Sequence, residues 1–133
     1  HANSIVLGAR GLLIIGASGA GKSGLSLQLM ALGALLVSDD RTVLQVHNNQ
    51  IWMSAPDRLS GLIEARGLGL LSAEPAGPAQ LCAVLDLDSE ETDRLPPRRE
   101  MYLLGHRCPL LFSVSSPYFA ASLIQYLKGD RRE

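Results

Sequence analysis

The sequence predicts a single α/β domain, a sheet carrying a phosphate-binding P-loop with helices flanking the sheet. Three observations favour this class. Residues 16–23 read GASGAGKS and match the Walker A pattern G-x-x-x-x-G-K-[ST]. The apolar run 12–15 predicts a buried strand before the loop, and apolar residues at helical spacing follow Lys22. The length of 133 residues allows one hydrophobic core but not two.

The loop composition explains why phosphate is the expected ligand. Glycines adopt backbone angles that a side chain would forbid, so successive N–H groups can turn toward a polyphosphate. The helix that begins at Lys22 adds the partial positive charge of its N-terminus. Lys22 would reach the β- and γ-phosphates, and the Ser23 hydroxyl would bind Mg²⁺. The expected nucleotide-binding residues are Gly16, Ala17, Ser18, Gly19, Ala20, Gly21, Lys22 and Ser23. The alternative is an ordinary glycine-rich turn between strand and helix.

The first half of the chain alternates apolar runs with turn residues. Strands are expected at 5–7 and 12–15, a helix at 22–32 that stops at Gly33, and a buried strand at 34–37. The stretches 42–46 and 50–53 then predict a hairpin with an exposed turn at His47, and Trp52 is expected in the core or partly covered.

The second half predicts three more strands and a helix. Strands are expected at 81–87, 101–104 and 109–114, and a final amphipathic helix runs from Pro117 to about Lys128. Its apolar face is Phe119, Ala120, Leu123, Ile124 and Leu127. The acidic stretch 88–93 and the basic, proline-interrupted stretch 94–99 are expected to be exposed loops.

Two adjacent acids, Asp39 and Asp40, follow the strand at 34–37. Ligands of α/β sheets gather beyond the carboxyl ends of strands, where these side chains would lie. One carboxylate can help to hold a metal ion while the other accepts a proton from an attacking hydroxyl. The alternative is an Asp-Asp turn with a capping role.

Glu64 and Arg66 stand within an apolar segment at 59–71. Burying either charge alone would be costly, so these residues either face solvent, pair with each other or line a polar site. A Glu64 oxygen could complete the coordination of a metal ion bound at Ser23.

Composition excludes several partners. The formal net charge of −1 offers no general attraction to nucleic acid or to an anionic membrane, and no apolar run approaches the ~20 residues of a spanning helix. Cys82 and Cys108 lack C-x-x-C spacing, so we expect reduced core thiols and a cytoplasmic location.

With these residues collected, the chain resembles the C-terminal catalytic domain of HPr kinase/phosphorylase, in particular the short forms of alphaproteobacteria. The resemblance covers most of the chain and is strongest in the first 71 residues. It rests on His1 ahead of the loop, GASGAGKS at 16–23, VSDD at 37–40, AP at 55–56 and LIEARGLG at 62–69. The last run looks like the family signature LLEIRGLGI.

The resemblance implies a fold of the HPr kinase and PEP carboxykinase type, in which 1–133 is one catalytic domain without the N-terminal domain of longer members. It implies a serine protein kinase that acts on the phosphocarrier HPr and regulates the phosphotransferase system, with Mg²⁺ and ATP or pyrophosphate. Reverse phosphorolysis and a hexameric homo-oligomer are also implied. The family's P-V-x-x-G-R-N stretch is missing near the last strand, where this chain reads PLLFSVSS at 109–116.

The family roles transfer to individual residues. By resemblance, the catalytic residues are His1, Lys22, Asp39, Asp40 and Arg94, the metal ligands are Ser23 and Glu64, and the further signature residues are Arg66, Gly67 and Gly69. We favour Asp40 as the proton acceptor. Two other functions remain open, a non-catalytic nucleotide-binding regulator and a kinase for a small metabolite.

Overall fold

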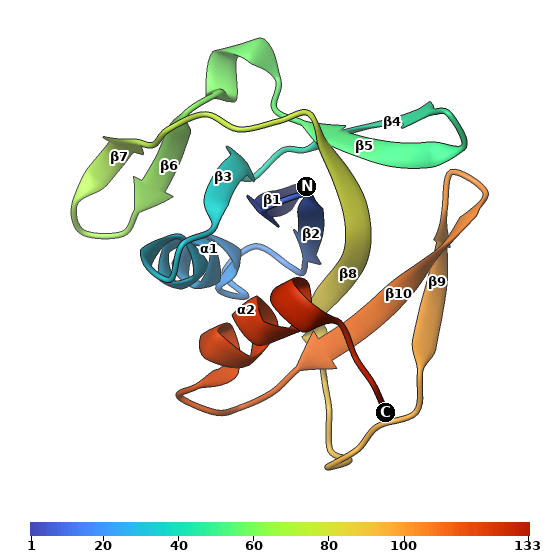
Figure 1. Cartoon of the computed structure of the whole chain (residues 1–133). Helices are drawn as coiled ribbons and strands as arrows, with labels where there is room; N and C mark the ends of the chain where they lie inside the picture. The colour runs from blue at the N-terminus through green and yellow to red at the C-terminus, as the bar shows by residue number, and fades with distance from the viewer.

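A computed structural model describes all residues, 1–133, as a mixed α/β fold with ten strands and two α-helices (Figure 1). In chain order the elements are β1 (Ala2–Leu7), β2 (Arg10–Ile15), α1 (Lys22–Ala31), β3 (Leu35–Ser38), β4 (Val43–His47), β5 (Gln50–Ser54), the 3₁₀ turn η1 (Asp57–Leu59), β6 (Leu62–Ala65), β7 (Gly69–Ser72), β8 (Ala79–Glu90), β9 (Arg99–Leu103), β10 (His106–Ser113) and α2 (Phe119–Gly129).

Eight strands form the central sheet. Its order is β3-β1-β2-β8-β10-β9, β5 pairs with the start of β8, and β4 pairs with β5. Strand β2 runs parallel to β8, whereas β1 runs antiparallel to both β2 and β3. The carboxyl-terminal ends of β2, β3 and β8 therefore lie at the same end of the sheet, and β1 begins at that end.

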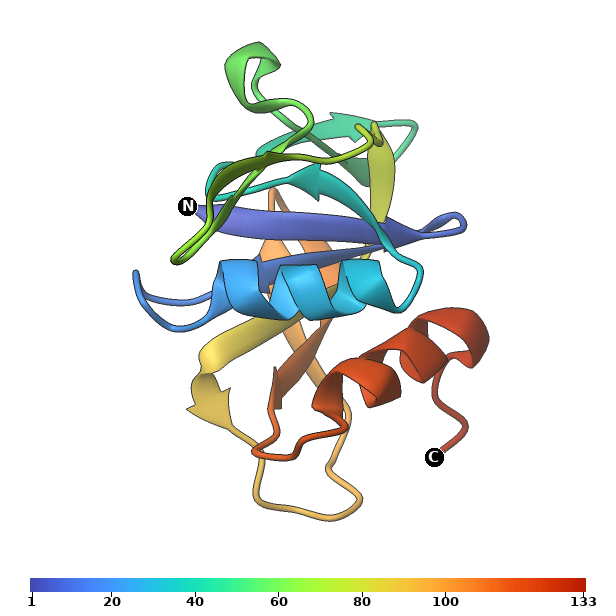
Figure 2. The ribbon, with the colours of Figure 1, turned by 90° about the vertical axis from the view of Figure 1, so that its left-hand side faces the viewer.

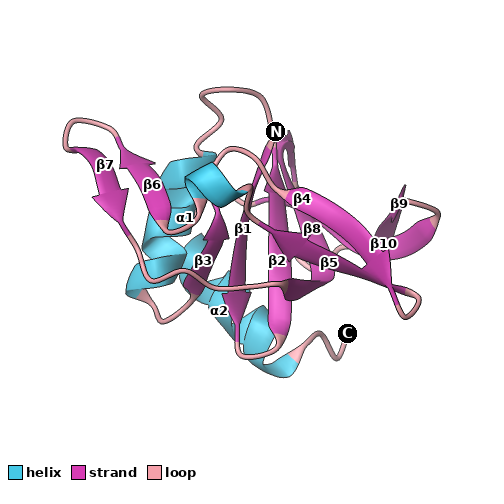
Figure 3. Cartoon of the chain, turned by 90° about the horizontal axis from the view of Figure 1, so that it is seen from above, coloured by secondary structure: helices cyan, strands magenta, loops and turns pink.

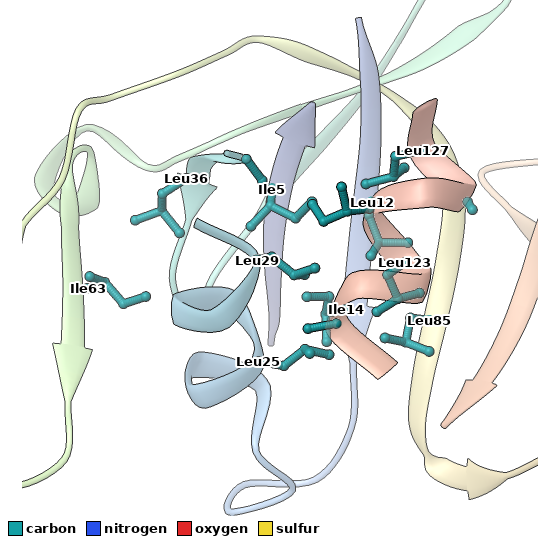
Figure 4. Packing of buried hydrophobic residues seen from close by; sticks show 14 residues of the cluster. Ile5, Leu12, Ile14, Leu25, Leu29, Leu36, Ile63, Leu85, Leu123 and Leu127 are labelled. Carbon is teal, nitrogen blue, oxygen red and sulfur yellow. The ribbon is translucent and has the colours of Figure 1, made fainter. Parts of the chain in front are cut away.

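Both helices cover one face of the sheet (Figure 2). Figure 4 shows Leu25 and Leu29 of α1 and Leu123 and Leu127 of α2 gathered around Leu12 and Ile14 of β2. These leucines recur at helical spacing, so burial of one apolar stripe on each helix holds the layer together. The apolar face expected for the final helix is confirmed, because its members are buried or pack against this core.

A second core lies on the other side of the sheet. Figure 3 shows α1, α2 and the β6–β7 hairpin on one side of β1 and β2, and the β4–β5 and β9–β10 hairpins on the other. Met53 and Cys108 are buried in this second core, and burial raises the pKa of the Cys108 thiol. Gly11 permits the close approach of β2 and β8, because a Cβ there would lie 2.5 Å from the Gln80 carbonyl oxygen.

Most predicted elements are confirmed with small shifts in their bounds. His47 is exposed and Trp52 is partly covered, as expected. His47 was predicted in the turn, but it is the last residue of β4 and pairs with Gln50, so the turn consists of Asn48 and Asn49. The thiols of Cys82 and Cys108 form no disulfide, although Cys82 is only half-buried. Helix α2 begins at Phe119, so Pro117 precedes the helix and does not open it.

The two charged stretches were predicted as exposed loops, and that prediction is wrong in part. Strand β8 continues to Glu90, because its acidic side chains at 88 and 90 alternate to the exposed face of the strand. The Glu91 carboxylate is only 9% exposed and accepts two hydrogen bonds from the Arg99 guanidinium, with Nε 3.1 Å from Oε1. The guanidinium also stacks 4.4 Å from the centre of the Phe112 ring.

The apolar segment at 59–71 forms the separate β6–β7 hairpin. Neither α1 nor α2 combines the length and the apolarity that a helix needs to cross a membrane.

Candidate functional site

A polar cavity of about 540 Å³ opens at the sheet edge where β2 and β3 end and β1 begins. Twelve residues line it, and only one of them is hydrophobic. They are Asn3, Ser18, Gly19, Gly21, Lys22, Ser23, Gly24, Leu27, Asp39, Asp40, Glu64 and Arg66. The cavity therefore gathers amide, lysine, hydroxyl and carboxylate groups from four separate segments of the chain.

The glycine loop at 16–21 joins β2 to α1 and forms one wall of the cavity. Gly19 and Gly21 have φ angles of 85° and 102°, in the left-handed region that favours glycine. Gly21 caps α1, so the helix begins at the cavity and its first N–H groups have no partner within the helix. This end of α1 suits an anion.

The start of the loop is held from two sides. The Lys22 ammonium donates to the carbonyl oxygens of Gly16 and Ala17, at 2.8 and 3.1 Å. The Ala17 N–H donates to the Asp88 carboxylate, at 2.9 and 3.1 Å from its two oxygens. The Lys22 side chain thus lies over the start of the loop, and Asp88 of β8 holds the Ala17 main chain by hydrogen bonds.

Asp39 is a buried carboxylate with three hydrogen-bond donors. The Ser23 hydroxyl donates at 2.6 Å and the Asn3 amide at 2.8 Å to Oδ1, while the Glu64 N–H donates at 2.9 Å to Oδ2. Only 9% of the residue is exposed. Because every neighbour donates, this position requires a group that accepts, which an ionised carboxylate provides.

Asp40 has a different environment. Its side chain is 66% exposed, and its Oδ1 lies 4.0 Å from Nδ1 of His1. Its backbone adopts a φ of 67°, an uncommon angle outside glycine that aspartate tolerates better than most residues. The predicted neighbourhood of His1 and the aspartate pair is therefore present, and Asp40 is the member with a free carboxylate.

The β6–β7 hairpin supplies the opposite wall. Glu64 and Arg66 both face solvent and line the cavity, and they form no ion pair with each other. Gly67 and Gly69, with φ angles of 87° and 123°, shape the hairpin turn outside the cavity lining. No group of three or more histidine, cysteine, aspartate or glutamate side chains is close enough to hold a metal ion by itself.

Arg94 is not brought to this cavity. It is exposed in the connection between β8 and β9 and does not line the site. Sequence reasoning also missed three residues, Asn3, Ser26 and Asp88. The position of Asp88 after an apolar strand was a usable signal, because carboxyl ends of parallel strands share one edge. Asn3 and Ser26 carry no comparable signal in the sequence.

The fold and the cavity together define a mixed α/β protein with a candidate anion-binding site built on a glycine loop. Residues 1–76 match the family described as the HPr Serine kinase C-terminal domain, and the chain belongs to this family.

Individual relatives agree with this assignment. The chain is 41% identical over 73 residues to the HPr kinase/phosphorylase of Malacoplasma penetrans. These matched residues make up 55% of this chain and 24% of that protein. It is 47% identical over 62 residues to the HPr kinase/phosphorylase of Variovorax paradoxus. That match makes up 46% of this chain and 19% of that protein. The chain thus matches about a quarter or less of the length of these curated relatives.

A solved structure extends the similarity to the whole chain. The Hpr(Ser) kinase/phosphatase from Coxiella burnetii superposes with a TM-score of 0.73 at 26% identity, covering 96% of this chain and 86% of that chain. The central sheet and both flanking helices therefore lie within the matched region.

Proposed function

We propose that this domain transfers the γ-phosphoryl group of ATP to a serine hydroxyl of an HPr-type phosphocarrier protein and so regulates the phosphotransferase system. The observation that carries the proposal is the convergence of Lys22, Ser23, Asp40 and Glu64 on one polar cavity. The names of the relatives, HPr kinase/phosphorylase, support HPr as the acceptor.

In this proposal the loop at 16–23 is a P-loop that binds the nucleotide phosphates. Its N–H groups and the start of α1 attract the anion, and the Lys22 ammonium lies 2.8 Å from the Gly16 carbonyl at the same wall. A positive charge held at this place offsets negative charge as it develops on the phosphoryl group.

The oxygen donors of the cavity suit Mg²⁺. Ser23, Asp39 and Glu64 offer hydroxyl and carboxylate oxygens, and the Ser23 proton is already donated to Asp39, which leaves the hydroxyl lone pairs available. Since Mg²⁺ usually takes one or two protein ligands and completes its shell with water and phosphate, Ser23 and Glu64 would hold it. Bound there, Mg²⁺ would neutralise phosphate charge.

Asp40 is the proposed base. The acceptor serine oxygen forms a bond to the γ-phosphorus, the bond from that phosphorus to the bridging oxygen breaks, and ADP leaves. Asp40 takes the serine proton, because its carboxylate is exposed while that of Asp39 is occupied by three donors. His1 lies at 4.0 Å and can orient the Asp40 carboxylate.

Several expectations from the sequence and from the family resemblance stay predictions. They are the use of pyrophosphate as donor, the reverse phosphorolysis, a hexameric assembly, a cytoplasmic location and a catalytic role for Arg94. Since Arg94 lies outside the cavity, any such role would require the connection between β8 and β9 to approach the bound nucleotide.

The test is transfer of radiolabel from γ-labelled ATP to HPr by the wild type and by Asp40→Asn. We expect the wild type to label one serine and Asp40→Asn to lose at least about 100-fold in rate, the lower end of what a general base contributes. Binding of a non-hydrolysable ATP analogue should remain, because the P-loop is unchanged.

Asp57→Asn is the matched control, since Asp57 is an exposed acid that does not line the cavity. Full activity of Asp40→Asn would remove Asp40 as the base. Binding of nucleotide by the wild type without any transfer to a phosphocarrier would favour the regulator instead.

A further inference from the structure

Asn3 is a polar residue with 0% exposed surface whose side chain reaches the floor of the cavity. It stands near the start of β1, which runs antiparallel to β2 and β3 and begins where those strands end. The antiparallel course of β1 thus places Asn3 between the P-loop side and the aspartate side of the site.

Both polar atoms of the Asn3 amide have hydrogen-bond partners. Its Nδ2 donates to Asp39 Oδ1 at 2.8 Å and to Ser26 Oγ at 3.0 Å, and its Oδ1 accepts from the Asp40 N–H at 2.9 Å. A carboxylate accepts and a peptide N–H donates, so these partners fix which end of the amide is which. Ser26 in turn donates to the Lys22 carbonyl at 2.8 Å, which frees its oxygen to accept from Asn3.

One side chain therefore holds both acids, each in a different way. It fixes the carboxylate of Asp39 and the main chain of Asp40, where φ is 67°. A residue at such an angle stays there when surrounding contacts hold it, and the bond from Asp40 to Asn3 is a contact of that kind. Asn3 thus holds the main chain from which the exposed Asp40 side chain extends.

We propose that Asn3 is a positioning residue that sets the geometry of Asp40 for proton transfer, an inference that rests on the proposed kinase function. Asn3 would act on catalysis through Asp40, and it would contact neither the nucleotide phosphates nor the acceptor serine.

The first test compares Asn3→Leu, which keeps a similar size without hydrogen bonds, with the wild type in the HPr transfer assay. We expect kcat to fall about 10- to 100-fold, as small misplacements of reacting groups do, while KM for ATP changes less than about threefold. Ser4→Ala is the control, because Ser4 is equally buried in β1 and its hydroxyl pairs with Thr42. This control should retain kcat.

The second test asks whether Asn3 acts through Asp40. In the double variant Asn3→Leu with Asp40→Asn, we expect no further loss of kcat beyond Asp40→Asn alone, because residues that act as a unit are not additive. Multiplied losses would overturn the proposal, and so would an Asn3→Leu variant with wild-type kcat.

A third measurement does not depend on catalysis. Hydrogen exchange of the Asp40 amide should be faster in Asn3→Leu than in the wild type and unchanged in Ser4→Ala. If the wild type transfers no phosphate to HPr, the proposed function fails, yet this exchange still decides whether Asn3 holds Asp40. Unchanged exchange in Asn3→Leu would overturn the inference. Should Asn3→Leu lose its cooperative thermal unfolding, Asn3→Ala, which also lacks the side-chain hydrogen bonds, replaces it and the same expectations hold.

Discussion

The adjacent aspartates differ in what surrounds them, although they are chemically identical. Asp39 is buried and accepts from Asn3, Ser23 and the Glu64 main chain. Asp40 is exposed, and its Oδ1 lies 4.0 Å from Nδ1 of His1. The surroundings thus make Asp39 a buried hydrogen-bond acceptor and leave the Asp40 carboxylate free. Two identical residues in sequence give no sign of this difference.

This division predicts different costs for the same substitution. Asp39→Asn replaces one acceptor oxygen by an NH₂ group among donors that remain buried, so we expect the free energy of unfolding to fall by about 1–3 kcal/mol. Asp40→Asn should change it by less than about 0.5 kcal/mol, as exposed substitutions usually do. Urea unfolding of both variants checks this, and equal losses would show that Asp39 is no more constrained than Asp40.

Among the site residues, Lys22 and Ser23 could be predicted, because the Walker A pattern at 16–23 lies within one short segment and includes both of them. Glu64 was predicted as a metal ligand, yet the structure also gives it a second contact, from its N–H to Asp39. That contact joins residues 25 positions apart in the chain, so no local pattern reveals it.

At the scale of elements, the β6–β7 hairpin is separate from the central sheet and packs against the domain mainly through β6. Ile63 of β6 is 1% exposed and packs into the core beside α1, as Figure 4 shows. Leu68 and Leu70, in the turn and the second strand, are exposed. The wall that carries Glu64 is therefore held to the domain mainly through its first strand.

Ile63→Ala should lower the free energy of unfolding by about 2–4 kcal/mol, because the truncation removes buried methyl groups and leaves a cavity. Leu70→Ala on the same hairpin should change it by less than about 0.5 kcal/mol. Chemical denaturation of the two variants gives the comparison. A loss for Leu70→Ala as large as that for Ile63→Ala would mean that a partner covers the exposed face.

At the scale of the whole molecule, an ion pair between Glu91 and Arg99 joins the two ends of the connection between β8 and β9. The hydrogen bonds from Arg99 hold the pKa of the Glu91 carboxyl below its ordinary value. Arg99 also stacks on Phe112 of β10, so the pair links three strands of the sheet.

A lowered pKa in the folded state means that the pair stabilises the fold when glutamate is ionised. This contribution is complete above the ordinary glutamate pKa of about 4.3 and is lost as the pH falls through the lower folded value. We expect Glu91→Gln to be less stable than the wild type at pH 7 and the difference to shrink toward pH 3. Urea unfolding across this range measures it.

Glu100→Gln serves as the control, because Glu100 pairs with Arg107 in an exposed position at 3.6 Å. Its difference from the wild type should stay small at every pH, as for most surface pairs. A Glu91→Gln difference that does not change with pH would contradict the proposed ion-pair contribution.

The sequence by itself determined the loop at 16–23, the aspartates at the end of the next strand along the chain and the existence of most strands and helices. Glycine spacing, apolar periodicity and turn residues act over short stretches of chain. Only the tertiary structure decided that β1 runs antiparallel between β2 and β3 and that β8 lies beside β2. Strand order and direction depend on packing between distant segments. They alone bring Asn3 to the aspartates and Asp88 to the loop.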